Sequence, residues 1–281
     1  MSSIAYITDS RMLQLHRLNN HKTMNFWRLS NNVNFSEFSI GDLVFFLSKD
    51  KQHLKGKEKG IVGFGKLKNI DVSSAKTMWN KYGILNGYNS FEDFKEALLK
   101  VSKDKQLPKK ISSFYLEDVC FFQPVYLSEC GVTISTNVES YIYLKPEEVV
   151  IKLLELAKTS KDLWASFDDE EIDKEEVLYS LNVIHSKIKD TKANKKAYKF
   201  LKAYVENTDY EFVHNCRNEI YELRDDELTI MFYVDKDTDI KSLLGQARLY
   251  RHYFAKICPK TIKLKFIVTN NDETLYNLLN A

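Results

Sequence analysis

Aromatic side chains close to glycines are the part of this sequence whose residue types could do chemistry. Rings occur at Phe26 and Trp27 and again in residues 79–82 (WNKY), and glycines recur in residues 60–65 (GIVGFG). Glycine allows a backbone to approach a ligand closely, and rings can stack on a flat base that has left its duplex. The combination indicates recognition of an extruded nucleobase rather than bond-breaking chemistry.

Candidates for contacting nucleic acid follow from these blocks. Trp27 follows Asn25-Phe26 and precedes Arg28 and a polar stretch, so we expect its ring where loops meet the mouth of a barrel, stacking on a base for about 1–3 kcal/mol. Trp79 belongs to the second aromatic block. Arg28 and Lys49 could contact phosphate, and Asn86, which precedes a glycine, could read a base edge. The sequence thus predicts a nucleic-acid-binding set of five side chains.

A purely structural explanation competes for most of these rings. Burying a Trp, Tyr or Phe ring stabilises a small barrel by roughly 2–3 kcal/mol. Most of the rings in these N-terminal blocks must therefore belong to the core. Trp27 is the best exception, and the two interpretations stay open for the other rings.

Length and composition fit an ordinary globular protein. The 281 residues suffice for two domains, with 44% hydrophobic and 28% charged residues. The sequence has no run of about 18 apolar residues, so we expect no transmembrane helix. No secretory signal is apparent either, so we expect a cytoplasmic protein without a membrane partner. The four cysteines form no CxxC pair, so reduced thiols are expected and a zinc site is not.

Charge is concentrated in blocks that the net value of +2 conceals. Basic stretches occupy residues 49–68, 100–110 and 185–202, and an acidic stretch occupies residues 162–176. Basic stretches beside an acidic one fit a polyanion-binding face and a solvated connector. Surface solubility is the alternative explanation for each block.

Residues 1–157 are predicted to form a β-rich domain with flanking helices. Apolar β-prone runs, turn signals and helical periodicity indicate these elements. The predicted strands are 4–8, 42–47, 60–67 and 119–127, and the predicted helices are 73–82, 90–101 and 148–157. Ser90 can cap the second of these helices, and Gly87 can hold a turn in the left-handed region.

Residues 158–185 are predicted to be an acidic connector, and residues 186–281 a second, α/β domain. Asp225-Asp226 indicates a hairpin between two of its strands. The predicted elements are a basic helix at 193–205, strands at 210–224 and 228–234, a helix at 240–254, a strand at 261–268 and a helix at 274–279. Lysines 195, 196 and 199 (Lys195, Lys196, Lys199) of the basic helix are candidates for binding DNA.

The order of the motifs FWRLS, FSEFSIGDLVFFLSKD, GIVGFGKL, MWNKYGILNGYNSFEDF and VCFFQPVYL resembles the PUA-like (EVE/SRA-type) module at the N-terminus of HNH-family restriction endonucleases. The resemblance covers residues 1–150. It implies a pseudo-barrel that reads double-stranded DNA, often at a modified or flipped base. Because relatives in the wider PUA superfamily bind RNA, RNA stays open.

The second domain carries no HNH motif, and its histidines stand alone in the sequence. Its α-β-β-α-β order resembles instead the PD-(D/E)XK nuclease fold. In that fold acids on two strands hold a divalent metal that activates water, and a lysine orients the nucleophile. By this resemblance Glu219 stands at the first acidic position and Gln246 on the family's glutamine-bearing helix.

The family's E-x-K position departs from the pattern. It falls on residues 233–235, where Tyr233 replaces the acid and Asp235 replaces the lysine. A bulge could rescue Asp235 and Lys236. The resemblance then implies catalytic Glu219, Asp235, Lys236 and Gln246, with Mg²⁺ held by Glu219 and Asp235; a degenerate scaffold or an unrelated α/β domain are the alternatives.

The prediction for the whole chain is a DNA-recognition protein of a restriction-type, anti-phage defence system. The first domain would read a base, and the second would cleave as a Mg²⁺-dependent endonuclease or pair two copies as a homodimer. The alternatives are a non-catalytic reader subunit that recruits a separate nuclease, and an RNA-binding PUA-like protein.

Overall fold

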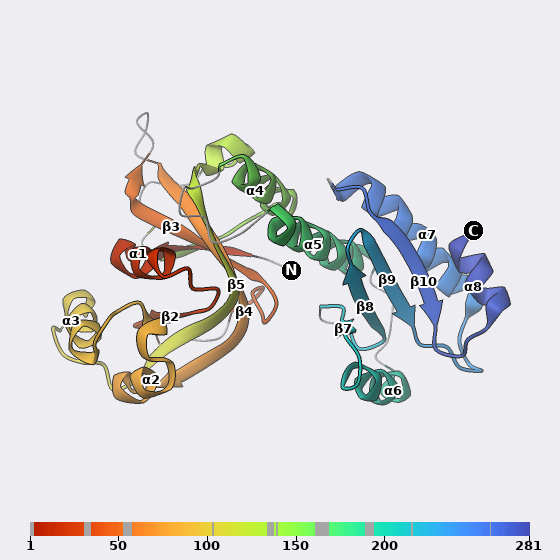
Figure 1. Ribbon diagram of the computed structural model, residues 1–281, viewed down its shortest axis with the longest axis horizontal. Coiled ribbons are helices and arrows are strands. Elements are labelled where there is room, and N and C mark those ends of the chain that lie inside the picture. Colours follow the sequence, from red (N-terminus) through yellow and green to blue (C-terminus); the bar gives the residue numbers. More distant parts are fainter. Residues whose placement is uncertain are drawn as a thin grey trace. The chain divides into compact units, whose positions relative to one another are not determined.

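The computed structural model describes residues 3–30, 35–52, 58–102, 104–133, 138, 140–160, 169–188, 194–214, 216–258 and 260–281, without the side chains of 49–52 and 169–172 (Figure 1). The chain divides into two compact units, Met1–Ile172 and Asp173–Ala281. Both contain helices and a multi-stranded sheet, so the mixed α and β class that we predicted is confirmed.

Six strands in the order β2-β5-β4-β3-β1-β6 form the sheet of the first unit. β1 is parallel to β3, and the other pairs are antiparallel. The strands are β1 (Ile4–Thr8), β2 (Met24–Arg28), β3 (Leu43–Gln52), β4 (Lys59–Ser73), β5 (Ile111–Val125) and β6 (Tyr141–Tyr143). Among the residues described, β2 and β6 do not pair with each other, so the closure expected of a barrel is not seen.

The glycines of β4 serve the contact between β4 and β5. The pairing of these strands shifts register between Ile61 and Gly63 and again between Phe64 and Lys66. A Cβ atom added to Gly63 would lie 2.4 Å from the carbonyl oxygen of Cys120, a distance that no side chain tolerates. These glycines therefore permit the register shifts and a close backbone approach, but the neighbour is a strand rather than a ligand.

Four α-helices belong to the described part of the first unit: α1 (Ser10–Leu18), α2 (Ala75–Tyr82), α3 (Phe91–Val101) and α4 (Glu148–Thr159). The Oγ atom of Ser90 accepts a hydrogen bond from the backbone N–H of Asp93 at 3.1 Å, which is the predicted cap of α3. Phe94 of α3 is fully buried and packs in one cluster with Met78 of α2. α2 and α3 thereby form a second core beside the sheet.

The sheet of the second unit has the order β10-β9-β8-β7. β8 is antiparallel to both of its neighbours, and β9 and β10 are parallel. The elements are α5 (Asp169–Ile188), α6 (Lys195–Val205), β7 (Glu211–Phe212), β8 (Glu219–Arg224), β9 (Glu227–Phe232), α7 (Ile240–Ile257), β10 (Lys263–Val268) and α8 (Glu273–Asn280). Asp225, at φ 48°, holds the two-residue turn of the predicted hairpin.

Helices cover both faces of this sheet (Figure 1). On one face, Leu201 of α6 packs against Ile220 and Met231. On the other, α5 and α7 share a core with the alternate residues of β8 and β9, such as Tyr221 and Ile230. Residues of a strand alternate between faces, so three layers result.

Part of the predicted acidic connector is instead a helix. Residues 169–188 form α5, and Val177, Leu181 and Ile184 are buried in the core of the second unit. Their spacing of three and four residues is that of a helix face. The acidic residues before them concealed this pattern in the sequence. None of the described helices combines the length and apolarity of a membrane span.

Candidate functional site

A hollow of about 490 Å³ lies in the first unit beside Trp27. The end of β1, the start of α1 and the end of β2 line it, with Tyr6, Ser10, Trp27 and Arg28 among the side chains. Ring faces, a hydroxyl and a guanidinium thus meet in a space of the size that small-molecule sites occupy, about 300–1,000 Å³.

Trp27 is half-buried, at the boundary between this hollow and the core. Its ring lies 5.7 Å from the ring of Phe94 and 6.3 Å from that of Tyr88. Its Nε1 atom is buried and has no hydrogen-bond partner among the described residues. The sequence placed Trp27 in a loop region, but it stands in β2, whose polar residues masked the strand. One side of the indole is therefore structural, and the remainder lines the hollow.

Arg28 is 7% exposed and its guanidinium lies among rings. Its Cζ atom is 4.9 Å from the ring centre of Phe35, 5.1 Å from that of Phe114 and 5.9 Å from that of Tyr6. Burial lowers the pKa of Arg28 from its usual value. Because Arg28 lines the hollow, a phosphate or base would meet it inside this space rather than on an open surface.

Asn86 occupies a structural position. It is fully buried; its Oδ1 accepts from Nδ2 of Asn25 at 2.8 Å, and its Nδ2 donates to the carbonyl of Gly83 at 2.8 Å. Gly87, which follows it, has the predicted left-handed conformation with φ 85°. These bonds hold the Asn86 amide inside the fold, so the geometry gives no support to the base contact predicted for it.

Trp79 packs against other rings instead of lining the hollow. Trp79 stacks on Phe94 with ring centres 5.9 Å apart, and Phe91 lies 6.2 Å away. It does not line the hollow. Lys49 is in β3, and its side chain falls outside the described residues.

A buried carboxylate marks the second unit. Glu219, the first residue of β8, is 1% exposed. Its Oε2 atom accepts a hydrogen bond from the Tyr250 hydroxyl at 2.7 Å, and Oε1 accepts one from Nε2 of Gln246. Nδ1 of His185 lies 3.5 Å from Oε2 of Glu219 and 2.9 Å from the Tyr250 oxygen. Of the predicted catalytic residues, the structure therefore brings Glu219 and Gln246 together.

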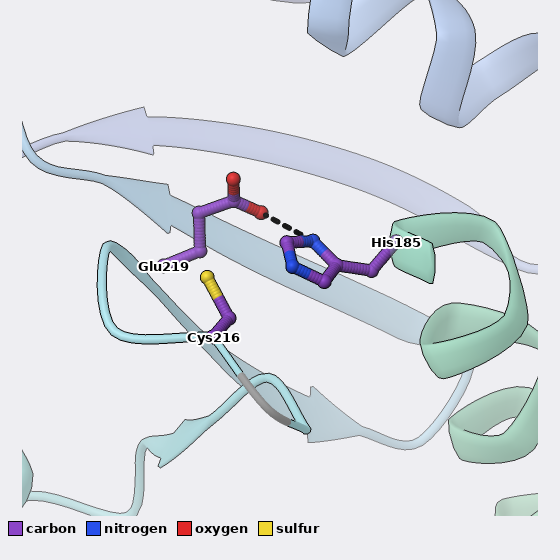
Figure 2. A group of neighbouring side chains, drawn as sticks. All are labelled: His185, Cys216 and Glu219. Atoms are coloured by element: carbon purple, nitrogen blue, oxygen red, sulfur yellow. Dashed lines mark ion pairs between the residues drawn. The ribbon is translucent and has the colours of Figure 1, made fainter. Parts of the chain in front are cut away.

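Cys216 completes this group. The ligand atoms of His185, Cys216 and Glu219 all lie within 4.8 Å of one another, and Figure 2 shows the three side chains converging. Burial lowers the pKa of His185, but hydrogen bonds and charge interactions with Cys216 and Glu219 outweigh it and raise this pKa to about 10. Burial and Glu219 raise the pKa of Tyr250 well above its usual value.

Asp235 and Lys236 lie in the loop after β9. Oδ1 of Asp235 accepts from the backbone N–H of Asp237 and from the Thr238 hydroxyl, both at 3.1 Å. Lys236 is exposed. The side chains gathered around Glu219 are those of α5, α7 and the loop before β8, and Asp235 is not in the group described above.

The donors present do not fit the Mg²⁺ that the nuclease resemblance implies. Magnesium requires near-octahedral oxygen ligands, with more than one carboxylate in most nuclease sites. A hollow of about 160 Å³ beside Glu219 is also lined by Asp239, but Oδ1 of Asp239 caps α7 through the backbone N–H of Lys241 at 3.0 Å. The metal-ligand atoms grouped with Glu219 are instead an imidazole nitrogen and a sulfur.

The lysines predicted to bind DNA lie on the solvent side of α6. Lys195, Lys196 and Lys199 are exposed, whereas Ala197 and Leu201 of the same helix are buried. The helix is therefore amphipathic, and its basic side is accessible.

His185, Cys216 and Tyr250 are the site residues that the sequence did not reveal. Cys216 and Glu219 are three residues apart, but His185 precedes Cys216 by about thirty residues and Tyr250 follows it at a similar distance. The packing of α5 and α7 on the sheet brings them together, and a spacing pattern does not show this.

No protein-family model matches the sequence, and no curated protein matches it. Among solved structures the chain is similar to ASCH from Zymomonas mobilis, at 15% identity and a TM-score of 0.39 over 55% of this chain and 94% of that one. Two mutant forms of the same protein match at 15% identity with TM-scores of 0.39 and 0.40, over 56% and 55% of this chain and 99% and 95% of theirs. A likeness of this size assigns neither a family nor a function.

Proposed function

We propose that the chain binds nucleic acid and that the hollow beside Trp27 receives one unstacked base. A single observation carries the proposal: Trp27 and Arg28 line one hollow of about 490 Å³. An indole can stack on any base, and a guanidinium can bind a base edge or a phosphate in a planar manner.

The finer part of the proposal concerns the polymer. Double-stranded DNA with a flipped or modified base is the ligand favoured by the motif order of the first 150 residues, and the exposed lysines of α6 would add contacts to phosphate. RNA is the second candidate, favoured by the same ring-and-cation lining because single-stranded RNA presents unstacked bases.

The role in a restriction-type system depends on the second unit. The hydrogen bond between Gln246 and Glu219 joins the two positions on which the nuclease resemblance depends. Since Asp235 bonds within its own loop, we propose that this unit binds DNA or pairs two copies of the chain rather than cutting. In a plasmid assay with Mg²⁺ or Mn²⁺ we expect no nicking of modified or unmodified DNA; nicking abolished by Asp235→Ala would contradict this.

The central experiment is a binding titration of the full chain by fluorescence anisotropy. Labelled double-stranded DNA, single-stranded DNA and single-stranded RNA of one sequence are compared at several salt concentrations. Trp27→Ala should weaken binding by about 1–3 kcal/mol because a stacked ring is lost. Trp79→Ala is the matched control, since it removes the same ring from a position that does not line the hollow.

The two variants separate recognition from stability. Both lose ring packing, so both should melt at lower temperature, and circular dichroism checks that each remains folded under the binding conditions. Equal affinities of folded Trp27→Ala and the parent would remove the hollow as the site. Absence of binding to all three polymers at low salt would refute the function itself.

A further inference from the structure

We propose that His185, Cys216 and Glu219 form a binding site for one Zn²⁺ ion in the second unit. This site is separate from the nucleic-acid proposal and shares no residue with the hollow at Trp27. It offers one imidazole nitrogen, one sulfur and one carboxylate oxygen, all within 4.8 Å of one another (Figure 2).

The chemistry of the donors selects the metal. Imidazole and thiolate are the ligands that zinc takes in proteins, and a carboxylate is the usual third partner, whereas magnesium and calcium take oxygen. Zinc–ligand bonds of about 2.0–2.3 Å in a tetrahedron place donor atoms roughly 3.3–3.8 Å apart. Nδ1 of His185 and Oε2 of Glu219 are already 3.5 Å apart, and a contraction of about 1 Å elsewhere in the group closes the cage.

Three different elements hold the ligands. His185 lies in the last turn of α5, Glu219 begins β8, and Cys216 lies in the loop between β7 and β8. All three are mostly buried, and Cys216 and Glu219 are 8% and 1% exposed. Side chains on packed helices and strands keep their positions better than side chains on open loops, so His185 and Glu219 are held in place for a metal, and Cys216 on its loop can move to complete the site.

Neighbouring groups orient the ligands in the way that metal sites require. Gln246 and the Tyr250 hydroxyl donate hydrogen bonds to Glu219. The backbone N–H of Asn218 donates to Sγ of Cys216 at 3.4 Å, which suits a sulfur that carries negative charge. Such outer contacts fix ligand orientation and raise metal affinity.

Zn²⁺ would add to the hydrogen bonds that already compensate the burial of Glu219. A carboxylate removed from water is costly unless a cation or several donors neutralise it. Zn²⁺ would neutralise it together with the Cys216 thiolate and would tie α5 to the sheet. A fourth position would be filled by water, as in zinc sites with three protein ligands.

The test uses the full chain, stripped with a chelator and titrated first with Co²⁺ and then with Zn²⁺. A thiolate bound to Co²⁺ gives a sulfur-to-cobalt charge-transfer absorption, so we expect this band to saturate at one equivalent and to disappear when zinc is added. Zinc content after dialysis should be one ion per chain, and the melting temperature should rise with free zinc.

Variants assign the ligands. Cys216→Ser should abolish the charge-transfer band and weaken zinc binding by about 100-fold or more, beyond the roughly 10–100-fold expected for Gln246→Ala, which removes an orienting hydrogen bond. Cys258→Ser and His252→Ala are matched controls from the same unit and should leave both signals unchanged. Circular dichroism establishes that each variant is folded; if Cys216→Ser is not, Gln246→Ala still tests the site through its weaker affinity.

Two results would overturn the proposal. One is the absence of stoichiometric cobalt and zinc binding by the folded parent chain, which would leave the three side chains as an ion-paired polar network. The other is a charge-transfer band that survives in Cys216→Ser or disappears in Cys258→Ser. Neither result affects nucleic-acid binding at Trp27, which a separate titration measures.

Discussion

Each unit buries a charged side chain, but the surroundings differ. In the first unit the guanidinium of Arg28 lies over the rings of Phe35 and Phe114 and beside a hollow. In the second unit the carboxylate of Glu219 accepts hydrogen bonds from Gln246 and Tyr250. Ring faces attract a cation through its charge, whereas the hydrogen bonds from Gln246 and Tyr250 fix both oxygens of the Glu219 carboxylate.

The difference separates the proposed recognition site from a group held by its own hydrogen bonds. A cation beside a space of about 490 Å³ can exchange partners when a planar ligand enters. A carboxylate with several donors around it is already organised, and it can accept only a small ion without rearranging its neighbours. Substitutions at Arg28 should therefore change ligand affinity, and substitutions at Glu219 should change the free energy of unfolding.

The largest effect is expected from Glu219→Ala. The change leaves His185, Gln246 and the Tyr250 hydroxyl without their common acceptor in a buried site, so the free energy of unfolding should fall by about 3–5 kcal/mol. Calorimetry of the metal-free full chain measures this. Glu222→Ala, on the same strand, is the control and should cost clearly less, because Glu222 pairs with the exposed Arg224, which water can solvate when the carboxylate is lost. Similar losses in the two variants would contradict the comparison.

Acid should weaken the first unit through His16. Burial, and then the neighbouring His21, lower the pKa of His16 from 6.5 to about 3. Between these values the unfolded chain takes up a proton that the folded chain does not, so this stability is complete above pH 6.5 and is lost as the pH falls towards 3. At about 1.4 kcal/mol per unit, the loss is about 3 kcal/mol between pH 6.5 and pH 4.

The variant His16→Gln isolates this contribution. Between pH 6.5 and pH 4, the free energy of unfolding of the variant should fall by about 3 kcal/mol less than that of the parent. Urea unfolding at the two pH values measures the difference. Parallel pH profiles would show that His16 takes up its proton in the folded chain as readily as in the unfolded one.

Elements with strong periodicity were predicted from the sequence, and elements with mixed polarity were not. The strand LVFFL of β3 and the helix of α7 follow from their apolar patterns. β2 was missed because Asn25 and Arg28 are polar although both are buried. Asn25 is buried because Asn86 binds it, and this contact spans sixty-one residues of sequence. Local composition does not show such a partner.

The same limit applies to the sites. Glu219 and Gln246 were found through a resemblance that fixes their positions on a strand and a helix. His185 was set aside as a lone histidine, since its partners lie on other elements. Asp235 was proposed as a ligand by its place in the chain, but its own loop provides nearer donors. Residue type and order therefore predicted two members of this side-chain group, and tertiary packing brings the other members to them.

A smaller effect is expected from Arg28→Lys. Lysine keeps the charge but loses the planar group that rests on Phe35 and Phe114 and that can bind a base or phosphate through two parallel bonds. Nucleic-acid affinity should fall by about 1–2 kcal/mol, with a smaller loss of stability. Anisotropy titrations and thermal unfolding give the two values. A loss of stability with unchanged affinity would mean that the guanidinium serves only the core.

The smallest effect per residue is expected from the surface lysines, and it shows which unit holds the polymer. In one triple variant Lys195, Lys196 and Lys199 of α6 are changed to Gln; in the other Lys105, Lys109 and Lys110 of the first unit are changed. All six are exposed. Each lost phosphate contact lowers the slope of log K against log salt by about 0.9 on duplex DNA and by about 0.7 on single strands.

If both units contact the polymer, each triple variant should lower the slope by up to about 2–3 while leaving base preference unchanged. A reduced slope for the first-unit variant alone would confine binding to the unit with the hollow. The group of His185, Cys216 and Glu219 would then be the remaining candidate for a function of the second unit. A reduced slope for the α6 variant alone, with unchanged affinity in Trp27→Ala, would reverse the comparison and make the second unit the nucleic-acid-binding part of the chain.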